Sequence, residues 1–100
     1  MSERGATEFV AECMWPDVHE DDLRALDQRA TEHVERLAAG GVKVRYLGSM
    51  LMREDEVVLC FFEGGLETVR DAASAAQIPF DRILETARSP WGPEHTVTER

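Results

Sequence analysis

The chain lacks most of the features that reveal an activity by themselves. Of its 100 residues, two are cysteines, one is a tyrosine, and 7% are aromatic. Two cysteines are too few for a disulfide framework. No stretch approaches the roughly 20 consecutive apolar residues of a membrane span. The first residues, MSERGATEF, contain no apolar run, which predicts that there is no signal peptide. Together these absences predict a cytoplasmic protein with reduced thiols.

Positive charge is scarce as well. Eleven Lys and Arg residues face 20 Asp and Glu residues, and the formal net charge is -9. This balance argues against a nucleic-acid partner, because phosphate binding needs clustered Lys and Arg. It is compatible with cation binding. The sequence also has no glycine-rich phosphate loop, no CxxC metal motif, and no Ser-His-Asp or Cys-His constellation.

The spacing of apolar residues predicts six elements of secondary structure. Strands are expected at residues 7–14, 42–52, 56–63 and 81–87, and helices at residues 20–39 and within 64–77. The order is β-α-β-β-α-β, which predicts an α+β, ferredoxin-like fold. Its four-stranded antiparallel sheet would have the order 4-1-3-2, with both helices on one face. We expect one domain at residues 1–88 and a C-terminal tail at 89–100.

Side-chain alternation predicts which residues of each strand face away from the helices. A charged residue is unfavourable beneath a packed helix, so Glu12, Arg45, Glu63 and Arg82 set the parity of their strands. The residues expected to face outward are Val10, Glu12, Met14, Arg45, Leu47, Ser49, Leu51, Val57, Leu59, Phe61, Glu63, Arg82 and Leu84. Those expected to face the helices are Phe9, Ala11, Cys13, Val42, Val44, Tyr46, Met50, Met52, Val58, Cys60, Phe62 and Ile83. A β-bulge in any strand would invert the assignment beyond it.

The outward surface is too apolar to remain in water, and the chain offers no third helix to cover it. We therefore predict a two-fold homodimer in which the two sheets pack face to face, a dimeric α/β-barrel. Five outward residues are expected to line a ligand pocket or the dimer face: Glu12, Arg45, Phe61, Glu63 and Arg82. A Glu12–Arg82 ion pair is expected, because buried charges are costly unless they are paired.

Four segments also support a family resemblance. They are FVAECMWPDV running into HEDDLRAL, the strands VRYLGSMLM and VVLCFFEG, and AAQIPFDRILE. Over roughly residues 7 to 87 the chain resembles a small bacterial family of ferredoxin-like domains that includes a nickel-binding protein. The resemblance implies a single domain that pairs into dimers, and nickel or another divalent metal as the ligand.

The stretch ECMWPDVHEDDL has two interpretations. His19 followed by Asp22 has the spacing of a helix capping box, and the acidic run after His19 suits the first turn of a helix. Alternatively, His19 and Asp22 ligate a divalent metal together, and Glu12 or a group of a second chain completes the set. Imidazole suits nickel, zinc and copper alike.

The expected function is that of a small cytoplasmic homodimer that binds a divalent metal or a small ligand without catalysis. Two alternatives stay open. One is a small enzyme with an inter-sheet cavity in which Glu12 acts as a general base. The other is a regulatory or interaction module that uses the same sheet face for a different partner. No membrane partner is expected.

Overall fold

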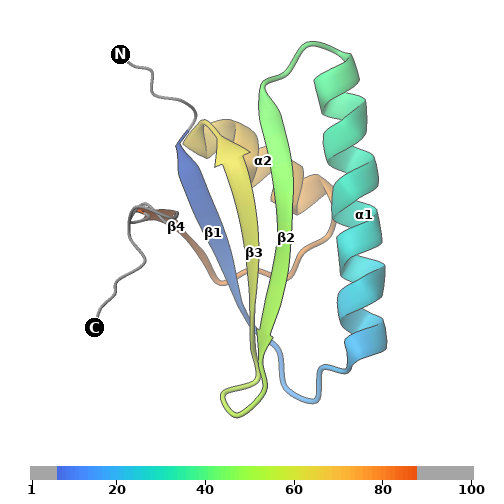
Figure 1. Cartoon of the computed structure of the whole chain (residues 1–100), viewed down its shortest axis with the longest axis vertical. Coiled ribbons are helices and arrows are strands. Elements are labelled where there is room, and N and C mark those ends of the chain that lie inside the picture. The colour runs from blue at the N-terminus through green and yellow to red at the C-terminus, as the bar shows by residue number, and fades with distance from the viewer. Residues whose placement is uncertain (1–6, 88–100) are drawn as a thin grey trace, which may run out of the picture.

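The computed structural model describes residues 7–87, and Figure 1 shows the arrangement of its elements. Along the chain they are β1 (Glu8–Met14), α1 (Glu20–Ala39), β2 (Val44–Met52), β3 (Val57–Gly64), α2 (Leu66–Ala75) and β4 (Arg82–Thr86). All six elements lie where the apolar spacing predicts them. The predicted tail at 89–100 lies outside the described residues.

The four strands form one antiparallel sheet in the order β2-β3-β1-β4. This order is the predicted 4-1-3-2 viewed from the opposite edge, so the ferredoxin-like α+β fold is confirmed. In Figure 1, α1 runs alongside β2 and α2 lies behind the strands. Both helices contribute to the same core, so one face of the sheet is covered by helices and, within residues 7–87, no helix covers the other face.

The core lies between the helices and the covered face of the sheet. In α1 the buried residues Leu26, Ala30 and Val34 recur every four positions, the spacing of one helix face. They meet the inward residues of β1 and β3, and the alternation predicted for these two strands is confirmed. The sheet residues in this cluster include Phe9, Ala11, Cys13, Val58, Cys60 and Phe62.

The predicted parity of β2 is wrong beyond Tyr46 because a β-bulge intervenes. The register with β3 shifts between Tyr46 and Gly48, which leaves Leu47 as the extra residue. Gly48 has φ 123°, a left-handed backbone conformation that favours glycine. From this point each side chain of β2 points to the face opposite the predicted one.

The bulge reverses four assignments. Ser49 and Leu51 were expected on the outward face, but Ser49 bonds to Asp27 of α1 and Leu51 packs against the core. Met50 and Met52 were expected beneath the helices, but 53% and 42% of their surfaces are exposed. Val42, also expected inside, precedes the strand and is 37% exposed.

A part-buried hydrogen-bond network fastens α1 to β2. The hydroxyl groups of Tyr46 and Ser49 donate to Asp27 Oδ1 at 2.5 and 2.7 Å. Burial, followed by the hydrogen bond to Asp27, raises the pKa of Tyr46 above its ordinary value, so the phenol stays protonated. The sequence does not predict this network, because no local pattern indicates which carboxylate will accept hydrogen bonds from the hydroxyl groups of a strand.

Candidate functional site: the uncovered sheet face

The sheet face opposite the helices is named here the open face. Its apolar side chains are Val10, Met14, Leu47, Met50, Met52, Val57, Leu59, Phe61 and Leu84, and its charged members include Glu12, Arg45, Glu63 and Arg82. The strand register joins the apolar residues into one surface. Val10 lies between Phe61 and Leu84, and Val57 lies between Met14 and Met52. Cross-strand neighbours on one face are in contact distance.

Part of this apolar surface is accessible to solvent, whereas Val10 and Val57 are buried at 7% and 8% exposure. Met14 is 60% exposed, Leu84 and Leu47 are each 38% exposed, and the two methionines of β2 are also exposed. Isolated exposed apolar residues are ordinary on a protein surface, but a contiguous group of them usually marks an interaction site. Methionine suits such a surface, since its flexible thioether adapts to different contact shapes. The open face therefore has the character of an interface.

An ion pair lies at the β1–β4 side of the open face, and the predicted Glu12–Arg82 contact is confirmed. Arg82 Nε donates to Glu12 Oε1 at 2.5 Å, and the two residues are register partners. The Glu12 side chain is only 25% exposed, whereas that of Arg82 is 63% exposed. The hydrogen bond to Glu12 raises the pKa of Arg82. One carboxylate oxygen of Glu12 is therefore engaged by a guanidinium.

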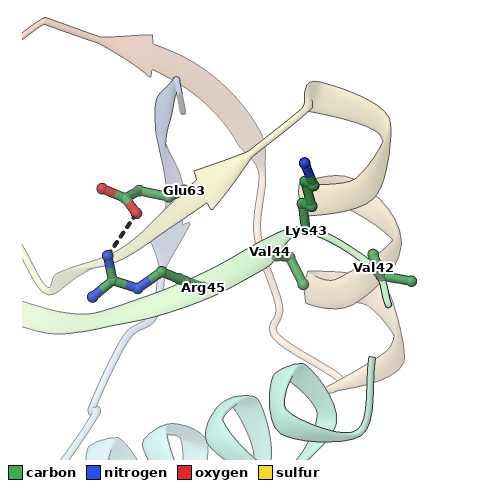
Figure 2. Close-up of a pocket in the computed structure, with 5 residues that line it drawn as sticks. All are labelled: Val42, Lys43, Val44, Arg45 and Glu63. Carbon is green, nitrogen blue, oxygen red and sulfur yellow. Dashed lines mark hydrogen bonds and ion pairs between the residues drawn. The ribbon is translucent and has the colours of Figure 1, made fainter. Parts of the chain in front are cut away.

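A second ion pair lies at the end of the open face near the start of β2. Arg45 Nη1 donates to Glu63 Oε1 at 3.0 Å across the β2–β3 register. Figure 2 shows this pair beside a pocket whose other lining residues are Val42, Lys43 and Val44. Phe61 lies two residues before Glu63, on the same face of β3. Four of the five predicted pocket residues thus form two separate ion pairs. The fifth, Phe61, lies on the apolar surface between these pairs.

His19 and Asp22 adopt the helix-capping arrangement. His19 is the N-cap of α1, and its backbone N–H donates to Asp22 Oδ2 at 2.9 Å. Glu12, the third predicted metal ligand, belongs to the open face, whereas α1 packs on the other face. Within residues 7–87, no three His, Cys, Asp or Glu side chains are grouped so that they could hold a metal ion. A metal site at these residues stays a prediction.

The two cysteines lie beneath the helices. Cys13 and Cys60 are free thiols with no exposed surface, on adjacent strands β1 and β3. The hydrogen bond that the Cys60 thiol donates to Cys13, followed by burial, raises the pKa of Cys60, which keeps that thiol protonated. These residues belong to the core and add nothing to the chemistry of the open face.

Comparisons with known proteins do not extend this description. No protein-family model matches the chain, and neither a curated protein nor a solved structure matches it. The resemblance to the family that includes a nickel-binding protein therefore stays a prediction. Of the helices within residues 7–87, none combines the length and apolar character needed to span a membrane.

Proposed function

We propose that this chain functions as a homodimeric, non-catalytic binding protein. Two copies cover each other's open face, and the assembly binds a small ligand at the charged margin of that face. The observation that supports the proposal is the contiguous apolar surface on the side of the sheet that the helices leave uncovered. The buried, free thiols of Cys13 and Cys60 suit a reducing compartment, so we place the dimer in the cytoplasm.

The size of the open face fits a modest dimer. Strands lie about 4.8 Å apart and outward residues repeat about every 6.8 Å, so each outward residue covers roughly 33 Å² of sheet. Seven apolar residues of the open face, leaving out the buried Val10 and Val57, then cover about 230 Å² per copy. At about 25 cal/mol per Å², covering both copies contributes about 12 kcal/mol before the cost of association, which is about 4–15 kcal/mol. At the lower end of that cost we expect a dissociation constant of roughly micromolar order.

The distribution of charge favours the same face. The chain carries a net charge of -9, so two copies repel each other on most of their surfaces. On the open face, Glu12 and Glu63 are each paired with an arginine. Two copies that meet through this face bring together apolar side chains and neutralised pairs, which reduces the repulsion at contact.

The mass of the native particle tests the pairing. Sedimentation equilibrium of the untagged chain over a range of concentrations should show a reversible monomer–dimer equilibrium. The metal content of the same sample tests the metal prediction separately. A particle that stays monomeric at every concentration contradicts the homodimer and leaves the open face to a different protein, as the interaction-module alternative expects.

The enzyme alternative makes a different structural prediction. It requires a cavity between the two sheets that reaches Glu12, and it requires Glu12 to be released from Arg82 when substrate enters. A structure of the dimer decides between the two, because side chains that fill the inter-sheet space around Glu12 leave no place for a substrate.

A further inference from the structure

A cavity of about 320 Å³ lies between α1 and the end of β2, the two elements that run side by side in Figure 1. Its apolar lining comes from Leu23 of α1 and Leu51 of β2, which are partly buried and pack against the core. Asp27 lines the same cavity. The cavity therefore belongs to the helix side of the sheet and not to the open face.

The apolar and acidic groups of this cavity converge because of their spacing. Leu23 and Asp27 are four residues apart on one side of α1, about 6 Å along the helix axis. Ser49 and Leu51 are two residues apart on one face of β2, about 6.8 Å along the strand. The Ser49 hydroxyl donates to Asp27 Oδ1 at 2.7 Å. This contact aligns the two elements so that Leu23 lies beside Leu51, one step along from the carboxylate.

The Asp27 carboxylate is oriented by neutral donors. The hydroxyl groups of Tyr46 and Ser49 both donate to its Oδ1 atom. In the part of the chain that the structure describes, Asp27 has no ion pair and its Oδ2 atom has no hydrogen-bond donor. A carboxylate held in place with one oxygen available is well suited to accept a hydrogen bond from a cationic donor.

The other charges around the cavity cancel. Arg53 and Glu20 line it and form an ion pair with each other. Arg24 also lines it and is paired with Asp21. Because both pairs are neutral, Asp27 leaves the cavity with one excess negative charge.

We propose that this cavity binds a small organic amine in its ammonium form, carried on a short apolar chain. The ammonium donates to Asp27 Oδ2, and the chain contacts Leu23 and Leu51. The site lies on the side of the sheet opposite the open face, so it goes beyond the proposed function and does not depend on the proposed pairing.

Charge and size set the ligand class. A monocation matches the single excess charge, and the net charge of -9 attracts cations to the chain. A bare metal ion needs several ligands, and among residues 7–87 no three His, Cys, Asp or Glu side chains are grouped to supply them. The volume of about 320 Å³ is at the lower end of the roughly 300–1,000 Å³ of ligand pockets, so the ligand must be short.

Titration followed by amide chemical shifts tests the proposal with hexylammonium chloride at neutral pH as the probe. Hexylammonium should give saturable shifts at the amides of Leu23, Asp27 and Leu51. Ammonium chloride, which lacks the apolar chain, and hexanol, which lacks the charge, should each bind at least about fivefold more weakly. No saturable shift in the parent, or shifts confined to the open face, overturns the proposal.

Asp27→Asn removes the charge and keeps an amide oxygen that accepts from the two hydroxyl groups. It should weaken hexylammonium binding by about fivefold. The matched control is Asp71→Asn, because Asp71 is an exposed carboxylate of the other helix, α2. It should leave binding unchanged. Equal weakening by the two variants would show that only the net charge of the chain matters, and it overturns the proposal.

Arg53→Gln tests the site by a gain of affinity, which a loss of folding cannot imitate. It frees Glu20 from its ion pair and adds one negative charge to the cavity. Binding of hexylammonium should tighten by at least about twofold. Arg70→Gln is the control, because it opens an exposed pair with Glu67 on α2. Equal tightening by both variants, or none by Arg53→Gln, contradicts the site.

The particle mass is measured on the same samples. Saturable binding to a monomer retains the amine site and contradicts the pairing. A dimer that does not bind hexylammonium retains the pairing and contradicts the amine site.

Discussion

Replacing Met50 with glutamate is the sharpest perturbation of the proposed dimer. Met50 is 53% exposed in a single copy, so the substitution leaves the monomer core intact. Covering the exposed half of a methionine contributes about 1 kcal/mol, and a two-fold dimer contains the residue twice. Each new carboxylate would also be desolvated without a partner, at about 1–3 kcal/mol. The dimer should therefore lose at least about 4 kcal/mol, which weakens association roughly a thousandfold.

Sedimentation equilibrium measures this loss directly. The control is Leu66→Glu, because Leu66 is a 39% exposed apolar residue at the start of α2, on the helix side of the sheet. Both variants add one negative charge to the chain. Met50→Glu should be monomeric at concentrations where the parent and Leu66→Glu are dimers. Equal dissociation of the two variants would show that general repulsion, and not coverage of the open face, controls assembly, and an unaffected Met50→Glu dimer would refute the interface.

Three further predictions concern the bulge, the buried phenol and the metal. Gly48→Ala should lower the free energy of unfolding in urea by about 1–2 kcal/mol through left-handed backbone strain, whereas Gly65→Ala, at φ -79°, should cost less than half as much. Tyr46 is the only tyrosine, so alkaline absorbance titration should show an onset above the ordinary pKa of about 10. Because the folded chain keeps this proton while the unfolded chain loses it, stability should fall as pH rises above about 10, and less so in Tyr46→Phe. Calorimetric titration with nickel should give heat that His19→Ala removes if the predicted metal site exists, and no heat in the parent would end that prediction.

The sequence predicts the element order and the inward faces of β1 and β3 because both signals are local. In β3, for example, Glu63 fixes the parity that places Val58 and Phe62 in the core. The Glu12–Arg82 pair follows from the same logic, since strand order and parity bring the two residues to adjacent positions on one face. Both predictions hold because the alternation of side chains between the two faces is not interrupted in the β1–β3 and β1–β4 pairs.

The repeat is interrupted in β2, and there the prediction fails. A glycine inside a strand is a known sign of a bulge, and Gly48 was available as that signal, but its position does not say which side chains move to which face. The hydrogen-bond partners of Asp27 could not be predicted either. Ser49 reaches Asp27 together with Tyr46 only because the bulge turns the Ser49 side chain toward the helices. The geometry of the open face therefore depended on a feature that alternation alone does not capture.

The single extra residue in β2 also sets the oxidative chemistry of this surface. It places Met50 and Met52 on the same side of the sheet as Met14, all three with accessible sulfur-bearing side chains. Conversion of a thioether to a sulfoxide makes an apolar side chain polar, and reductases reverse the change. A mild oxidant would thus make this side of the sheet more polar and weaken the proposed pairing, whereas the two buried thiols of the core would remain intact.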